Sequence, residues 1–123
     1  MGKKILAIDD DFTERKILQT LFTHWGFDIE LAVNGQEGLS KAAQLVPDLI
    51  ITDVMMPDMD GYSMLMNLKA NDALKDIPVI VLTGQSGERY QTISEGFGAV
   101  HHLNKPVDPP NLLSKVKQIL EME

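Results

Sequence analysis

The sequence feature that most constrains the fold is the alternation of short, β-branched apolar runs with longer segments of helical periodicity. The runs lie at residues 5–8, 49–52 and 79–83 and contain almost no polar residue. Strands of a parallel sheet look like this because helices cover both faces of the sheet. The alternation therefore predicts an α/β fold rather than an all-α or all-β one.

The segment after the first run carries the signals of an amphipathic helix. Asp11 is a suitable N-cap, Glu14 follows three residues later, and Gly26 is a suitable stop. The apolar residues between them fall on one helical face: Ile17, Leu18, Leu21, Phe22 and Trp25. We expect this helix to pack on the sheet.

Similar signals predict the remaining elements. We expect further strands at 27–33 and 99–103, helices at 36–45, 62–70 and 87–96, and a last helix that begins after Asp108 and Pro109. Five strands then alternate with five helices in one doubly wound parallel domain over residues 1–123. Ligands of such folds bind at the carboxyl ends of the strands.

Composition excludes several classes of function. Lys and Arg total 11 against 18 Asp and Glu, for a net charge of −7, so a direct nucleic-acid partner is not expected. The chain has no cysteine, which excludes disulfides and zinc sites with thiolate ligands. No signal peptide or long apolar span is seen, so we expect a cytoplasmic protein without a membrane partner.

Polar residues stand at the carboxyl ends of four predicted strands. They are Asp9, Asp10, Asp53, Thr83 and Lys105. Clustered carboxylates repel one another unless a cation holds them ionised. Oxygen-only ligands suit Mg²⁺, with Mn²⁺ as an alternative ion, and a phosphate-bearing substrate would complete the coordination. The lysine ammonium and the threonine hydroxyl would bind phosphoryl oxygens, which leaves Asp53 as the candidate nucleophile.

These motifs resemble those of the CheY-like receiver domains of response regulators in two-component phosphorelay systems, over essentially the whole chain. The similarity lies in four segments: residues 5–11 (ILAIDDD), 53–61 (DVMMPDMDG), 83–84 (TG) and 105–106 (KP). It implies a flavodoxin-like sheet with the strand order 2-1-3-4-5.

The resemblance also implies roles for individual residues. Asp53 matches the phosphorylated aspartate, Asp10 a direct Mg²⁺ ligand, and Asp9 a carboxylate that acts largely through metal-bound water. The backbone carbonyl of Met55 matches a further metal ligand. Thr83 and Lys105 match the pair that contacts the phosphoryl group.

Three positions are implied to serve the conformational switch. The family implies a cis peptide bond before Pro106 and a movement of Thr83 toward the phosphoryl group. His102 occupies the place where the family commonly has a Tyr or Phe that turns inward. As a candidate gate, a histidine would make the switch sensitive to pH near neutrality.

The implied function is that of a phosphoacceptor switch and not of an enzyme. The chain would take a phosphoryl group onto Asp53 from a histidine kinase or histidine phosphotransfer protein, phosphorylate itself from small donors, and dephosphorylate itself. The output partner would dock on the helix near 87–96, the strand near 99–103 and the last helix.

The residues leave two alternatives open. One is a Mg²⁺-dependent phosphohydrolase with an aspartyl-phosphate intermediate, although Met55 stands where such an enzyme has a second Asp. The other is an interaction module or flavodoxin-like cofactor binder that works without phosphorylation. Both a stand-alone switch and a domain of a longer regulator are compatible with the sequence.

Overall fold

The computed structural model describes residues 3–53, 61–84 and 101–121. Five strands form one parallel sheet in the order β2-β1-β3-β4-β5: β1 (Lys4–Ile8), β2 (Asp28–Ala32), β3 (Leu49–Thr52), β4 (Val79–Thr83) and β5 (His101–Asn104). This topology confirms the expected fold class. None of the helices in the described part of the chain combines the length and the apolar character that a membrane span requires.

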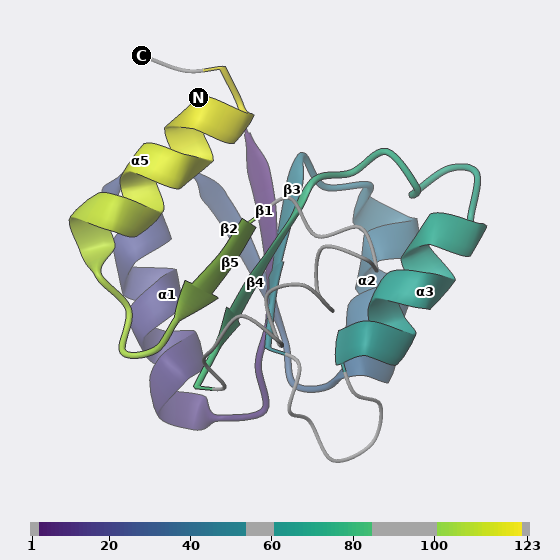
Figure 1. Ribbon diagram of the computed structural model, residues 1–123, viewed down its shortest axis with the longest axis horizontal. Helices are drawn as coiled ribbons and strands as arrows, with labels where there is room; N and C mark the ends of the chain where they lie inside the picture. Colours follow the sequence, from purple (N-terminus) through teal and green to yellow (C-terminus); the bar gives the residue numbers. More distant parts are fainter. Residues whose placement is uncertain (1–2, 54–60, 85–100, 122–123) are drawn as a thin grey trace.

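The described helices cover the two faces of the sheet. They are α1 (Phe12–His24), α2 (Gly35–Leu45), α3 (Gly61–Ala70) and α5 (Pro109–Ile119). Figure 1 shows α1 and α5 together on one face and α2 and α3 on the other. The helix predicted near 87–96 and the start of the strand predicted at 99–103 lie outside the described residues.

Two apolar clusters fill the space between the helices and the sheet. The cluster beneath α1 and α5 contains Phe22, whose ring meets Trp25 edge-on with centroids 5.2 Å apart. Phe27 packs on the same ring at 5.5 Å. The cluster beneath α2 and α3 includes Ile8, Ala42, Met64 and Leu65. Burial of each large side chain contributes about 1.5–3 kcal/mol.

Gly38 lets α2 approach the sheet closely. A Cβ atom built on it would lie 2.4 Å from Cδ1 of Ile8 and 2.9 Å from Cγ1 of the same side chain. Both distances are too short for real atoms, so a larger residue would force the Ile8 side chain or the helix to shift. Because Ile8 directly precedes Asp9, this contact also supports the edge where the polar residues gather.

Polar side chains begin the helices as the sequence predicts. Asp11 accepts a hydrogen bond from the backbone N–H of Glu14 at 2.9 Å, and Asp108 accepts from that of Asn111 at 3.4 Å. Asn34 caps α2, which therefore begins at Gly35, one residue earlier than expected.

Candidate functional site

The site lies where β1 and β3 end side by side. Ile8 pairs with Thr52 across the two strands, and the N–H of Asp53 donates to the Ile8 carbonyl at 3.1 Å. Asp9 and Asp53 therefore leave the sheet as neighbours. Their side chains are 2% and 8% exposed, which is unusual for carboxylates.

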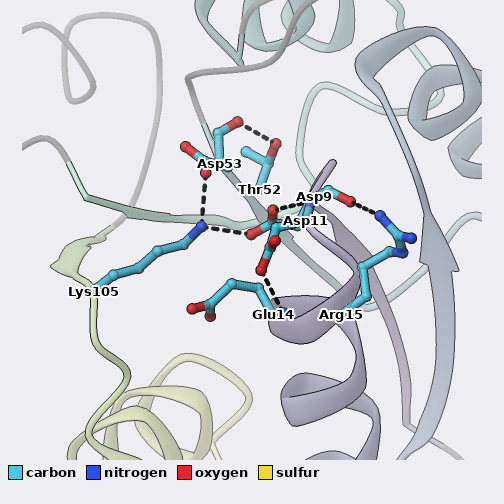
Figure 2. A network of polar contacts seen from close by, with 7 residues as sticks. All are labelled: Asp9, Asp11, Glu14, Arg15, Thr52, Asp53 and Lys105. Atoms are coloured by element: carbon cyan, nitrogen blue, oxygen red, sulfur yellow. Dashed lines mark hydrogen bonds and ion pairs between the residues drawn. The ribbon is translucent and has the colours of Figure 1, made fainter.

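Lys105 joins these two carboxylates across 96 and 52 residues of sequence. Its Nζ lies 2.8 Å from Oδ2 of Asp9 and 2.8 Å from Oδ2 of Asp53, as Figure 2 shows. The lysine follows β5, and only 16% of its side chain is exposed. The peptide bond between Lys105 and Pro106 is cis, the isomer that the family resemblance implied.

Burial and charge oppose each other at this edge. Burial raises the pKa of the Asp9 carboxyl above its ordinary value, although hydrogen bonds from Lys105 and from the N–H of Asp11 act to lower it. Burial alone would lower the pKa of the Lys105 ammonium. Its hydrogen bonds and charge attraction to Asp53 and Asp9 outweigh that effect, so the net pKa is raised and the ammonium stays protonated.

Asp9 is held from every side by hydrogen bonds. Its N–H donates to the carbonyl of Ala32 at 3.1 Å, and its Oδ1 accepts from the N–H of Asp11 at 2.9 Å. Its backbone carbonyl accepts from Nη1 of Arg15 at 2.7 Å, and its Oδ2 accepts from Lys105. Because the Asp11 N–H is engaged in this way, it is not available to the Glu14 side chain.

Three carboxylates can meet on one metal ion. Each of Asp9, Asp10 and Asp53 offers an oxygen, and the three oxygens lie within 4.8 Å of one another. An oxygen-only set of this kind fits a hard divalent cation such as Mg²⁺. Asp10 is exposed whereas the other two are buried, so this cluster opens to solvent on the Asp10 side.

The structure brings together four of the predicted site residues and positions two others. Asp9, Asp10, Asp53 and Lys105 form one cluster. Thr83 ends β4 opposite Asn104 in β5. His102 lies half-buried in β5, opposite Val81. Met55 lies outside the described residues.

Two residues at the site were not predicted from the sequence. Arg15 contacts the Asp9 carbonyl from the first turns of α1. The buried Thr52 donates its hydroxyl to the carbonyl of Asp53 at 2.8 Å. The signal for Thr52 was a polar residue at the end of an apolar run. An arginine near the start of a helix carries no comparable signal, because most are solvated.

Comparison with known proteins gives concordant matches. The response regulator receiver domain model matches residues 5–117. The probable transcriptional regulator ycf29 of Pyropia yezoensis is 38% identical over 98% of this chain, and protein PilG of Pseudomonas aeruginosa is 35% identical over 94%. The chain spans about half (54%) of the length of ycf29 and 86% of that of PilG.

A solved structure with bound ligands is also similar. A chain in the crystal structure of the CheX–CheY–BeF3–Mg²⁺ complex from Borrelia burgdorferi superposes with a TM-score of 0.89 at 29% identity. The similarity covers 95% of this chain and 88% of that chain. The two chains therefore share the same fold over almost their whole length.

Proposed function

The chain belongs to the family of response regulator receiver domains of two-component signal transduction, and from this membership we propose that Asp53 is its phosphoacceptor. In this proposal residues 1–123 form one receiver domain that switches between an unphosphorylated and a phosphorylated state. The observation that supports it best is the Lys105 ammonium, 2.8 Å from both Asp9 and Asp53. A fixed ammonium group at this point is suited to donate hydrogen bonds to phosphoryl oxygens.

The proposed transfer uses the Asp53 carboxylate as the nucleophile. Its oxygen bonds to phosphorus while the phosphorus–nitrogen bond of the donor's phosphohistidine breaks, and the electron pair leaves with the imidazole nitrogen. Lys105 would then exchange part of its contact with Asp53 for a phosphoryl oxygen. Thr83, at the end of the neighbouring strand, is proposed to contact another such oxygen.

We propose that the metal is held by Asp9, Asp10, Asp53 and the backbone carbonyl of Met55. The fit rests on the three carboxylate oxygens that lie within 4.8 Å of one another. When bound, Mg²⁺ would neutralise charge on the transferred phosphoryl group, and Mn²⁺ has the same ligand preference. The domain would phosphorylate itself from small phosphodonors through the same groups.

Hydrolysis of the aspartyl phosphate is proposed to reset the switch. Met55 stands two residues after Asp53 and offers no polar side-chain atom to orient the attacking water. We therefore expect slow autodephosphorylation. The domain would receive its phosphoryl group from a histidine kinase or histidine phosphotransfer protein in the cytoplasm.

The output step is proposed to involve the side of the sheet near β5 and α5. Movement of Thr83 toward the phosphoryl group would change the neighbouring surface, with His102 in β5 as the gate. A protein target would dock on the segment near 87–96 together with β5 and α5. The crystal structure with the similar chain is a complex of CheX and CheY, which supports a protein as the target.

The phosphoacceptor is tested by intact-mass measurement after incubation with Mg²⁺ and acetyl phosphate. We expect one added phosphoryl group on the wild type and on Asp76→Asn, which replaces an exposed aspartate remote from the cluster. Asp53→Asn should gain none, and omission of the metal should slow the reaction strongly. Phosphorylation of Asp53→Asn to the wild-type level would contradict the assignment.

A further inference from the structure

Arg15 makes a contact that the proposed chemistry does not use. Its Nη1 donates to the backbone carbonyl of Asp9 at 2.7 Å, a short hydrogen bond from a charged donor (Figure 2). The carbonyl lies just beyond the last residue of β1, where the regular pairing of the sheet stops. Among the described residues Arg15 is its only hydrogen-bond donor.

The pairing between β1 and β2 ends at this level. The Ala32 carbonyl accepts from the N–H of Asp9. In this register the next residue of the chain to face the Asp9 carbonyl is Asn34, which is the N-cap residue of α2. The neighbouring strand therefore turns into α2 instead of continuing the ladder. Arg15 takes the place of the missing strand partner.

The orientation of this carbonyl decides the direction of Asp10. The carbonyl belongs to the planar peptide unit between Asp9 and Asp10, so holding its oxygen restricts the backbone rotations on both sides. The Asp9 carboxylate is fixed independently by Asp11 and Lys105. In the described part of the chain, no hydrogen bond or ion pair holds the exposed Asp10 carboxylate. Its direction therefore depends on the backbone.

We propose that Arg15 is a positioning residue of the metal site, which holds the peptide between Asp9 and Asp10 so that the Asp10 carboxylate points into the cluster. The proposal rests on the proposed Mg²⁺-dependent function. It assigns to Arg15 no contact with the metal or with the phosphoryl group.

Charge and position predict opposite effects of removing this side chain. Arg15 is a cation close to carboxylates, so its charge alone disfavours a second cation, and its loss would strengthen Mg²⁺ binding. If its hydrogen bond orients Asp10, its loss weakens Mg²⁺ binding. Lys16 is the matched control, because it is the next residue of α1, carries the same charge and is exposed.

The experiment is calorimetric titration of the metal-free variants with Mg²⁺. We expect Arg15→Ala to weaken Mg²⁺ affinity about 3- to 10-fold, the effect of one net hydrogen bond. Lys16→Ala should leave the affinity unchanged or slightly tighter, and Arg15→Lys, which keeps a charged donor, should recover part of the loss. In metal-free Arg15→Ala, NMR relaxation should show a lower order parameter for the Asp10 amide, which a pure charge effect would not cause.

The outcomes separate this proposal from the function on which it rests. Equal or tighter Mg²⁺ binding by Arg15→Ala, with wild-type binding intact, overturns the positioning role alone. Failure of the wild type to bind Mg²⁺ overturns both. If Arg15→Ala does not fold, Arg15→Gln keeps a neutral donor and carries the comparison. If only the charge of residue 15 affects Mg²⁺ binding, Arg15→Gln should bind Mg²⁺ more tightly than Arg15→Lys. If the hydrogen bond to the Asp9 carbonyl determines Mg²⁺ affinity, Arg15→Gln should bind Mg²⁺ no more tightly than Arg15→Lys.

Discussion

The two apolar clusters between the helices and the sheet, which we call the layers, bury hydrocarbon side chains. The carboxyl edge of the same sheet buries charged side chains, and the chain passes from the layers to this edge at the end of β1. Ile5, Leu6 and Ile8 are almost fully buried among apolar side chains, and the next residue, Asp9, is 2% exposed among charges. In the layers, burial is favourable for each side chain. At the edge, burial raises the pKa of Asp9, and Lys105 is needed to compensate.

This difference separates the region that stabilises the fold, the layers, from the region that holds the charged groups of the candidate site, the carboxyl edge. Buried carboxylates next to one another disfavour the folded state unless a cation joins them. The edge can keep them because the layers beneath hold β1 and β3 in register. We therefore expect substitutions in the layers to change stability without changing metal binding, and substitutions at the edge to change both.

The largest expected effect is in the layer beneath α1. Phe22→Ala should lower the free energy of unfolding by about 3–5 kcal/mol, because it leaves a cavity beside Trp25 and Phe27. Phe12→Ala in the same helix should change it by less than about 0.5 kcal/mol, because Phe12 is 71% exposed. Urea unfolding measures both, and equal losses would remove the distinction between the layer and the surface.

The second-largest expected loss of stability follows removal of the Lys105 ammonium at the carboxyl edge. Lys105→Met should lower the free energy of unfolding of the metal-free protein by about 2–3 kcal/mol at pH 7–8, because two buried carboxylates lose their partner. Lys16→Met, at an exposed position, should have little effect.

The pH dependence of this loss has a definite sign. The stabilisation by Lys105 is fully present below the ordinary lysine pKa of 10.5 and is lost as the pH rises through the raised pKa of the folded state. In Lys105→Met the pKa of Asp9 lies higher still, so the folded state keeps a proton at a pH where the unfolded state has lost it, and stability recovers as the pH falls. A loss in stability that is the same at pH 5 and pH 8 would contradict this coupling.

Gly38→Ala tests the connection between the layers and the edge. The new Cβ would overlap Ile8, and the cost of this overpacking exceeds the gain in helix propensity by about 1 kcal/mol. Ile8→Val in the same chain removes the atom at 2.4 Å and should recover part of the loss, whereas Ser40→Ala on the exposed side of α2 should cost nothing. Thermal unfolding of the wild type, the two single variants and the double variant measures the coupling between residues 38 and 8. If the changes in the free energy of unfolding of the two single variants simply add in the double variant, the two residues are not coupled.

The smallest expected effect has the opposite sign. Asp10→Asn should raise the free energy of unfolding of the metal-free protein by about 0.5 kcal/mol, because it removes one of three mutually repelling carboxylates. The same variant should lose the stabilisation that added Mg²⁺ gives the wild type. Asp76→Asn is the control, and a destabilised Asp10→Asn would show that repulsion does not dominate at this edge.

Local sequence signals were sufficient wherever neighbours in the chain decide the structure. The apolar runs at 49–52 and 79–83 became strands with those bounds, and Asp11 and Asp108 begin helices because their side chains accept from N–H groups three residues ahead. The four residues now found in the cluster were predicted from their places at strand ends. Parallel strands made that inference possible, because their carboxyl ends share one edge.

What the sequence determined by itself is therefore the order of strands and helices and the identity of the charged residues at one edge. Only the tertiary structure decided that Lys105 reaches both Asp9 and Asp53, that Arg15 holds the Asp9 carbonyl, and that α2 lies so close to β1 that a side chain at Gly38 would overlap Ile8. The physical reason is the distance along the sequence over which each kind of interaction acts. Periodicity and capping act over a few residues, whereas these contacts depend on how the strands align and how closely the helices pack on them.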